Sequence, residues 1–216
     1  AFRVFESEDK AKAIKKFGSE DAKKAVSTHL PKEVGMNEDG NKEILELFDS
    51  KVFSFPKPTN LIQHFLTTIN DKDFIVLDFF AGSGTTAHAV LELNKEDGGN
   101  RKFIMVQMPE PCDENNEAFK AGYKTIADIG KERIRRVIKN IEKEKTEKPD
   151  LFDKGNLDLG FKAFKLASSS FKIWRSQEIT EENLEQQLDA FTNPTRPGAE
   201  KQNMLYELML KAGYGL

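Results

Sequence analysis

A short apolar run that breaks directly into a glycine turn constrains this chain more than any other feature. Residues 74–80 read Phe-Ile-Val-Leu-Asp-Phe-Phe, and Gly82 and Gly84 follow just before a helix-like segment begins at Thr85. Glycine has no side chain, so it allows positive φ and lets the backbone approach a ligand closely. The first turn of the next helix presents N–H groups to polar oxygens. This order of elements indicates a site for a nucleotide-shaped ligand.

Three classes of cofactor site use such a turn, and the neighbouring residues separate them. A phosphate-binding P-loop requires Lys after its last glycine, where this chain has Thr85 and Thr86. A dinucleotide site requires a third glycine or an alanine three residues later, and Ala87 occupies that place. The pattern Phe-x-Gly-x-Gly of S-adenosylmethionine sites matches residues 80–84 at every position. The P-loop interpretation is therefore weak, and the dinucleotide interpretation survives in part.

Hydrophobic periodicity places the turn in a larger unit. Apolar residues at helical spacing predict a helix over 61–69, with Pro58 in its first turn, and a second helix over 85–94. Apolar runs predict strands over 74–80 and 103–107. Strand, helix and strand at this spacing predict a βαβ unit, with parallel strands and a right-handed crossover. A ligand is then expected at the C-terminal ends of the strands.

Two further segments carry a resemblance to a known family. Residues 57–61 read Lys-Pro-Thr-Asn-Leu, which resembles the Lys-Pro-x-x-Leu element that DNA amino-methyltransferases place ahead of their glycine turn. Residues 101–111 read Arg-Lys-Phe-Ile-Met-Val-Gln-Met-Pro-Glu-Pro and resemble the second strand of the modification (Mod) subunit of type III restriction-modification systems. Over about residues 36 to 145 the chain thus resembles a Mod subunit, a β-class DNA adenine-N6 methyltransferase.

The resemblance implies an α/β fold with a parallel, Rossmann-like methyltransferase sheet, and S-adenosylmethionine as the cofactor. It implies that Phe80 packs near the cofactor, that Asp78 accepts from its ammonium group and that Lys57 meets its carboxylate. Gln107 stands where an acid usually binds the ribose, and Glu110 is the alternative. The expected cofactor-binding residues are Lys57, Asn60, Asp78, Phe80, Ala81, Gly82, Ser83, Gly84, Thr85, Thr86 and Gln107.

Simpler explanations and other functions stay open at this point. Thr85 and Thr86 could cap the next helix, Asp78 could be a loop carboxylate, and a lone Lys before Pro is usually solvated. The chain could also be an assembly module, in which residues 150–216 dimerise and dock a restriction subunit while the glycine turn is vestigial. A DNA cytosine-N4 methyltransferase is a further alternative, and an NAD-linked Rossmann enzyme is disfavoured by the missing third glycine.

One element that the resemblance leads us to expect is absent. The catalytic Asp-Pro-Pro-Tyr element of the family precedes the glycine turn, yet this sequence contains no Pro-Pro pair and begins with Ala1. We therefore expect the C-terminal portion of a longer enzyme, with no catalytic residue of its own and no activity alone. Double-stranded DNA, a restriction (Res) subunit and a second copy of the chain are the partners that the resemblance implies for the parent protein.

Composition sets outer limits. The chain has 216 residues, a net charge of −3 and a single cysteine, Cys112. It contains no apolar run long enough for a membrane span, and the lone cysteine fits a reducing cytoplasm, so we expect a cytoplasmic protein. The net charge gives no overall attraction to nucleic acid. His29, His64 and His88 lack metal-ligand spacing, so no metal is expected.

The sequence predicts three parts. Residues 1–50 would end a target-recognition region and form a linker, with a turn at 36–41 and a short helix at 42–48. Residues 51–148 would form the cofactor-binding half, closed by a long helix within 118–145. Its basic residues could touch a DNA phosphate, but such charges are more often solvated. They are Lys131, Arg133, Arg135, Arg136 and Lys139.

The third predicted part is a small α+β domain over residues 149–216, a possible dimer or subunit interface. Aromatic and apolar residues predict strands at 159–166 and 171–174. Apolar stripes predict helices at 180–191 and 200–212, with Gly213 placed to end the second.

Overall fold

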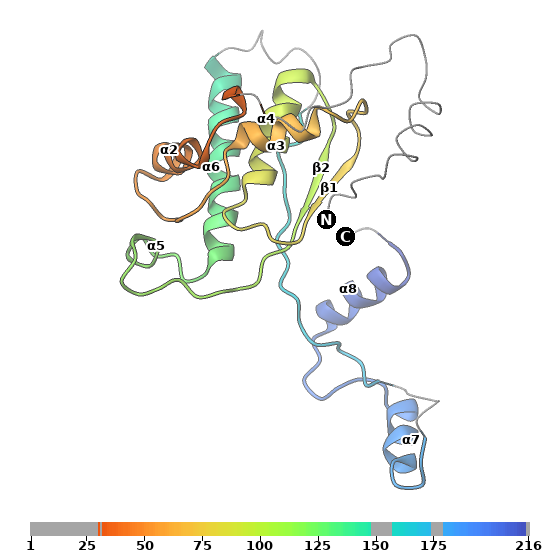
Figure 1. Ribbon diagram of the computed structural model, residues 1–216. Coiled ribbons are helices and arrows are strands. Elements are labelled where there is room, and N and C mark those ends of the chain that lie inside the picture. The colour runs from red at the N-terminus through yellow and green to blue at the C-terminus, as the bar shows by residue number, and fades with distance from the viewer. Residues whose placement is uncertain (1–29, 31, 148–156, 174–178, 215–216) are drawn as a thin grey trace. The chain divides into compact units, whose positions relative to one another are not determined.

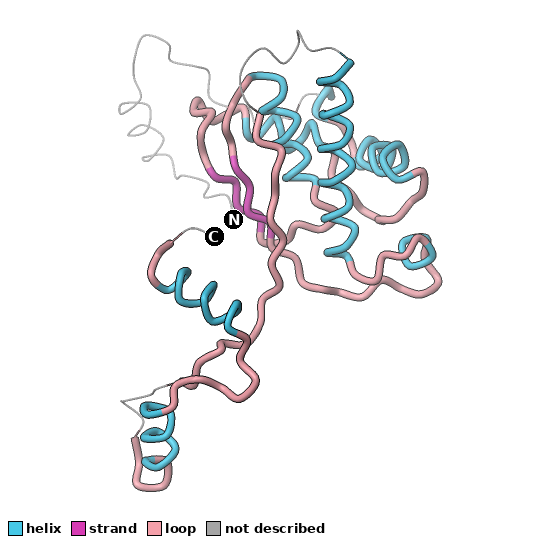
Figure 2. Tube along the Cα trace, turned by 180° about the vertical axis from the view of Figure 1, so that it is seen from behind, coloured by secondary structure: helices cyan, strands magenta, loops and turns pink. Residues whose placement is uncertain are grey.

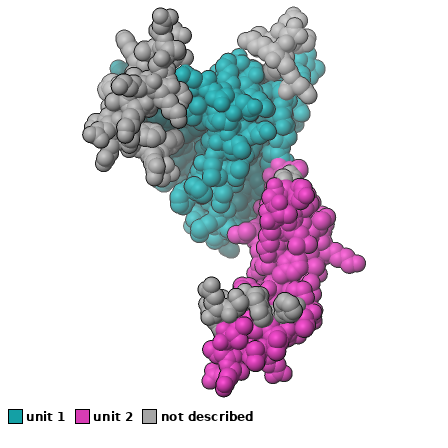
Figure 3. Space-filling view, turned by 90° about the vertical axis from the view of Figure 1, so that its right-hand side faces the viewer, with its two compact units in different colours: residues 1–161 teal, residues 162–216 magenta. Residues whose placement is uncertain are grey.

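The computed structural model describes residues 30, 32–147, 157–173 and 179–214 (Figure 1). The chain divides into two compact units, residues 1–161 and 162–216 (Figure 3). The expected division into three functional parts stays a prediction, and much of its first part lies outside the described residues.

Two short parallel strands form the centre of the larger unit. Strand β1 spans Ile75–Asp78 and strand β2 spans Lys102–Met105, in a register that places Val76 opposite Phe103 and Asp78 opposite Met105. Helix α4, Thr85–Asp97, connects them and ends where Gly98 adopts the left-handed conformation, with φ of 68°. The predicted parallel pair is confirmed, with shorter strands than expected, and the wider Rossmann-like sheet stays a prediction.

The helices of this unit lie on one side of the two strands (Figures 1 and 2). Helix α3, Thr59–Leu66, packs with α4 against Val76 and Phe103, and helix α6, Ile126–Glu147, packs on the other side of α4. Side chains alternate across a strand, so the next residue along each strand points away from this core. These apolar residues are exposed: Ile75, Leu77 and Ile104.

Helix α2, Asn37–Phe48, begins five residues earlier than the sequence predicts, so the turn expected at 36–41 is wrong. The Asp39 carboxylate accepts from the Met36 N–H at 2.8 Å and stabilises the helix start. Gly40 lies within the helix and packs closely against the segment before α3. A Cβ at this position would come within 2.4 Å of the Pro56 carbonyl oxygen. Close packing against the segment before α3 therefore overrides the turn preference of these residues.

The long helix predicted within 118–145 is confirmed as α6, Ile126–Glu147, but a separate short helix precedes it. Helix α5 spans Glu117–Lys120, and the chain then turns at Gly122, with φ of 94°, before α6 begins. The Thr125 N–H and hydroxyl both bond to the Asp128 carboxylate, at 3.0 and 2.8 Å, and stabilise the start of α6. The 310 helix η1, Lys32–Val34, precedes α2.

The smaller unit contains the two predicted helices, α7, Leu184–Thr192, and α8, Lys201–Lys211, although α7 begins four residues later than the sequence predicts. Gly213 follows α8 with φ of 79°. The two strands predicted at 159–166 and 171–174 are wrong for the residues described there, which form only an isolated bridge between Phe171 and Thr195. Between the two predicted segments, the Glu207 carboxylate accepts from the Ser170 N–H at 2.7 Å. Across the described residues, no helix is both long and apolar enough to cross a membrane.

Candidate functional site

The glycine turn, residues 80–84, lies at the C-terminal ends of both strands. The Ala81 N–H donates to the Val106 carbonyl oxygen at 3.1 Å, and the Gly84 N–H donates to the Ala81 carbonyl oxygen at 2.8 Å. Phe80, at the start of the turn, is 88% exposed. The turn is thus bonded to the end of β2 while its first side chain faces solvent.

Both glycines of the turn are required by the geometry. Gly82 and Gly84 have φ of 52° and 81°, a region that favours glycine. A Cβ on Gly84 would lie 3.1 Å from the carbonyl oxygen of Gly130 in α6, and a Cβ on Gly130 would lie 3.2 Å from the Gly82 carbonyl oxygen. The backbone of α6 therefore packs directly against the inner side of the turn.

The Asp78 carboxylate organises the entrance to the turn. One oxygen accepts from the Phe80 N–H at 3.0 Å, and the other accepts from the Thr86 hydroxyl at 2.6 Å. The N-cap of α4 is Gly84, so the helix cap expected from Thr85 or Thr86 is wrong. The Thr86 hydroxyl instead joins the helix to the end of β1.

Gln107 bridges the end of β2 and the turn. Its Oε1 accepts from the Gly82 N–H at 2.7 Å, and its Nε2 donates to the Met108 carbonyl oxygen at 3.2 Å. Glu110, the alternative for ribose binding, is exposed farther along the same segment. The structure thus brings Gln107, and not Glu110, into contact with the glycine turn.

Lys57 precedes α3 and Asn60 lies in its first turn, and α3 packs against α4. Both side chains are exposed, and Lys57 Nζ lies 3.5 Å from Asn37 Oδ1. The predicted cofactor residues differ in exposure, and Asp78, Ala81, Gly82 and Gln107 are half-buried. Lys57, Asn60 and Phe80 face solvent, whereas Ser83, Thr85 and Thr86 are buried.

The buried hydroxyls of the turn face an arginine on α6. Arg133 is fully buried, and its Nη1 donates to Ser83 Oγ at 3.1 Å and to Thr85 Oγ1 at 2.9 Å. Ser83 and Thr85 are only 2% and 7% exposed. Their hydroxyls are thus committed to the protein interior.

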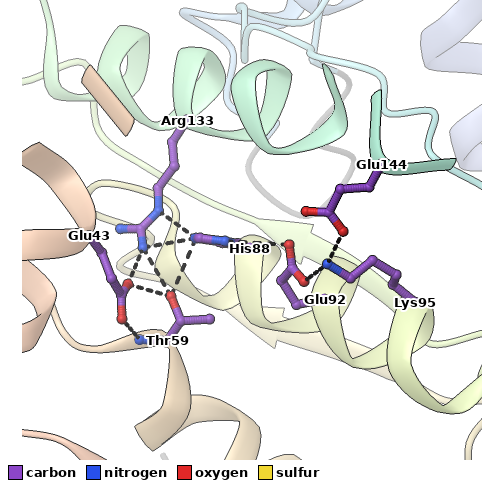
Figure 4. Close-up of polar contacts among 7 residues, drawn as sticks. All are labelled: Glu43, Thr59, His88, Glu92, Lys95, Arg133 and Glu144. Carbon is purple, nitrogen blue, oxygen red and sulfur yellow. Dashed lines mark hydrogen bonds and ion pairs between the residues drawn. The ribbon is translucent and has the colours of Figure 1, made fainter. Parts of the chain in front are cut away.

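The rest of the same guanidinium reaches α2, α3 and α4 (Figure 4). Arg133 Nη2 donates to Glu43 Oε2 at 2.9 Å and to Thr59 Oγ1 at 3.2 Å. Glu43 also accepts from the Thr59 N–H at 2.8 Å and from the Thr59 hydroxyl, so it holds the start of α3. Arg133 Nε donates to His88 Nδ1 at 3.3 Å. We call Glu43, Thr59, His88 and Arg133 the Arg133 cluster.

Electrostatics fix the protonation state of this cluster. Burial, and then the positive charges of Arg133 and Lys95, lower the pKa of His88 to about 3. A neutral ring that accepts at Nδ1 carries its proton on Nε2, which lies 4.0 Å from Glu92. Burial lowers the pKa of Arg133 to about 10, against the opposing effect of Glu43, so the guanidinium stays charged at neutral pH.

Arg133 was not predicted as a site residue, since its sequence neighbours favour a solvated, charged helix face. That assignment is wrong for Arg133, although Arg135 is exposed as expected. A signal was present: Arg133 falls in line with Ile129, Val137 and Ile141 at intervals of four residues, so it occupies the buried stripe of α6. Glu43 and Gly130 carried no comparable signal, because their partners lie far away in the sequence.

Other groups of possible chemical interest have simple surroundings. Burial, followed by the Asp128 charge, raises the pKa of Cys112, which is a free thiol. His64 lies on α3, and His29 falls outside the described residues. Within the described ranges, no group of three or more His, Cys, Asp or Glu side chains could hold a metal ion.

Comparison of the sequence with known proteins identifies a family. Residues 2–111 match the family model described as DNA methylase. The chain is 49% identical over 135 residues to the type III restriction-modification enzyme StyLTI Mod subunit of Salmonella typhimurium, covering 62% of this chain and 20% of that protein. It is 34% identical over 186 residues to the type III EcoP15I Mod subunit of Escherichia coli, covering 84% of this chain and 26% of that subunit.

A relative outside the type III systems is also similar. The type II methyltransferase M.KpnI of Klebsiella pneumoniae is 34% identical over 151 residues, covering 70% of this chain and 36% of that enzyme. The chain thus spans between 20% and 36% of the length of these three relatives.

Proposed function

The chain belongs to the DNA methylase family, and we propose that it is the S-adenosylmethionine-binding half of a DNA adenine-N6 methyltransferase, the Mod subunit of a type III restriction-modification system. The similarity to two type III Mod subunits supports this choice of system. The activity is proposed for the parent protein, because this chain covers only a minor part of each relative.

The glycine turn at the ends of two parallel strands is the observation that carries the proposal. Its backbone is free of a side chain at the half-buried Gly82, and the exposed ring of Phe80 stands beside it. An adenosine group fits such a place, because side-chain-free backbone permits close approach and an aromatic ring offers a packing surface. When bound, S-adenosylmethionine supplies an electrophilic methyl group on its sulfonium centre.

The polar groups around the turn suit the rest of this cofactor. Each Asp78 oxygen accepts one hydrogen bond, so the carboxylate keeps lone pairs for an ammonium group. Gln107 Oε1, which accepts from Gly82, keeps a lone pair for a ribose hydroxyl. The exposed Lys57 would meet the cofactor's carboxylate and Asn60 would lie beside it. These roles, and those of the backbone of residues 81–86, complete the proposed cofactor site.

The proposed substrate is an adenine in double-stranded DNA. A base inside a duplex cannot reach a cofactor held in a protein crevice, so the target base would be flipped out of the stack. The catalytic Asp-Pro-Pro-Tyr element is absent from this sequence, so we assign the groups that hold the base to the rest of the parent protein. We propose that the parent works in the cytoplasm as a homodimer with a restriction subunit.

Calorimetric titration with sinefungin, a stable analogue of the cofactor, tests the proposal. We expect the protein to bind sinefungin and the Gly82→Val variant to lose binding, because the new side chain adds strain at φ of 52° and points towards Phe53. Gly122→Val is the matched control, since Gly122 has φ of 94° with open space around it, in the loop between α5 and α6. Absence of binding by folded, unsubstituted protein would refute the proposal.

A further inference from the structure

We propose that Arg133 is a positioning residue for the cofactor site: it sets the shape of the glycine turn from inside the protein and couples that turn to the Lys-Pro element ahead of α3. The inference rests on the proposed function, since it concerns the same site. It assigns a role to a residue that lies outside both sequence motifs and faces away from solvent.

The first step of the argument is the direction of the turn's side chains. Two N–H groups of Arg133 Nη1 reach Ser83 and Thr85, which stand on either side of Gly84. With both hydroxyls bonded inside the protein, the backbone between them is fixed at Gly84, which is itself buried against Gly130. The position of Gly84 therefore depends on a bond from α6 on each side of it.

The second step is the link to α3. Arg133 Nη2 donates to Thr59, the first residue of α3, and to Glu43, which also holds the Thr59 N–H. Thr59 comes two residues after Lys57, the residue proposed to meet the cofactor's carboxylate. One guanidinium thus fixes the distance between the two segments that would hold the cofactor.

The third step is the shape of α6 itself. Gly130 and Arg133 are three residues apart, so they lie on the same face of the helix. Gly130 lets the helix backbone come within van der Waals contact of the turn, and Arg133 then reaches past that contact to the hydroxyls. Neither feature stabilises α6, since glycine is a poor helix former and a buried charge is costly to desolvate. Their joint presence is explained by the turn that they hold.

The fourth step is the chemistry of the side chain. A guanidinium has five N–H donors in a fixed plane, and here all three nitrogens donate, to acceptors on α2, α3, α4 and the turn. A lysine offers three donors from one point and cannot span the same set of acceptors. Arg133→Lys therefore keeps the charge opposite Glu43 and releases the turn.

The experiment compares Arg133→Lys with Arg136→Lys in the whole protein, with sinefungin as the probe. Arg136 is a suitable control, because it also joins α6 to α2, through the Leu47 carbonyl oxygen at 2.8 Å, but does not touch the turn. At a temperature well below unfolding, we expect Arg133→Lys to raise the Kd for sinefungin by about ten-fold or more and Arg136→Lys to change it by less than about two-fold. The amide resonances of Ser83 and Gly84 should shift only in Arg133→Lys, which a general loss of stability would not cause.

A second variant covers the case in which Arg133→Lys does not fold. Ser83→Ala combined with Thr85→Val leaves Arg133 and Glu43 paired and removes only the bonds to the turn. We expect the same loss of affinity from it. Native affinity in either folded variant, with normal binding by the unsubstituted protein, overturns this inference alone. No binding by the unsubstituted protein overturns the proposed function as well.

Discussion

Two buried arginines stand at opposite ends of α4, and they are held in different ways. Arg133 approaches the N-terminal end from α6 and is fully buried. Arg101 precedes β2 near the C-terminal end and is 5% exposed. Its guanidinium donates from Nη1 and Nη2 to the two oxygens of Asp97, at 3.0 and 2.9 Å. The backbone N–H of Arg101 donates to Asn94 Oδ1 at 3.1 Å.

The difference lies in the range of the contacts. The hydrogen-bond partners of Arg101 named above lie four and seven residues away, so this arginine fixes the loop that joins α4 to β2. The partners of Arg133 lie 45 to 90 residues away, so this arginine joins separate elements. Arg101 Nε is also buried without a hydrogen-bond partner, whereas every nitrogen of the Arg133 guanidinium donates. The local arginine tolerates an incomplete set of bonds, and the long-range one is fully bonded.

The largest expected effect follows from removing the long-range arginine. Arg133→Met leaves Glu43 without its positive partner and removes the hydrogen bonds that Arg133 donates to Thr85 and Thr59 inside the protein, so the free energy of unfolding should fall by about 3–5 kcal/mol. Denaturation in urea, followed by circular dichroism, measures the loss. Arg101→Met is the counterpart at the other end of α4. A greater loss from Arg101→Met than from Arg133→Met would reverse the comparison.

Acid should loosen the Arg133 end of α4 before the Arg101 end. Because burial and Arg133 lower the pKa of His88 to about 3, the unfolded chain binds a proton more readily than the folded chain between pH 6.5 and 3. The stability that neutral His88 contributes is therefore fully present above pH 6.5 and is lost as the pH falls towards 3. At pH 5 the loss is at most about 2 kcal/mol. Unfolding free energies measured across this range should show the slope, and His88→Gln should flatten it.

The Arg101 end responds to acid in a different window. Arg101 lowers the pKa of Asp97 from 3.8 to about 2, with Gly99 and Lys72 contributing. The stability that this carboxylate provides is present above pH 3.8 and is lost as the pH falls through about 2. A slope that persists in His88→Gln between pH 6.5 and 5 would show that other groups govern the acid response.

Neutralising Asp97 at neutral pH should have a smaller effect. Asp97→Asn keeps the shape of the side chain but removes the charge opposite Arg101, so we expect a loss of about 1–2 kcal/mol. Glu96→Gln, at the exposed neighbouring position of α4, is the matched control and should change little. Thermal unfolding of the two variants compares them directly, and equal melting temperatures would show that the Arg101 pair contributes nothing measurable.

The two arginines also show how far the sequence could predict this structure. The glycine turn, α4 and the parallel strand pair follow from local patterns, namely an apolar run, two glycines and helical spacing. The start of α2 and the placement of Arg133 depend on contacts with residues far away in the sequence, and a local pattern cannot contain them. Gly40 was assigned to a turn because its contact with Pro56 is invisible in the sequence. Likewise, the strands expected after residue 158 had no described partner strand to pair with.

The same limit applies to the candidate site. The residues of the glycine turn could be named from the motif, but the motif does not say which side chains face a cofactor and which face the core. Phe80, Ser83 and Thr85 are all predicted cofactor-binding residues, yet Phe80 is 88% exposed and Ser83 and Thr85 are buried. Contacts with α6 cause that difference, and α6 begins more than 40 residues after the turn in the sequence.

The smallest expected effect tests whether Arg133 stays in place when it loses one hydrogen bond to the turn. Thr85→Val removes one acceptor of Arg133 Nη1, and Ser83 Oγ, at 3.1 Å, remains for the same nitrogen. The loss of stability should therefore be only about 1 kcal/mol. At the other end of α4, Asn94→Ala should cost more, because the Asn94 amide accepts from the Arg101 N–H and also donates to the Arg101 carbonyl oxygen at 2.8 Å. If Thr85→Val proves the more damaging of the two in urea denaturation, the bonds to the turn act as a single unit, and Ser83 alone cannot hold the guanidinium in place.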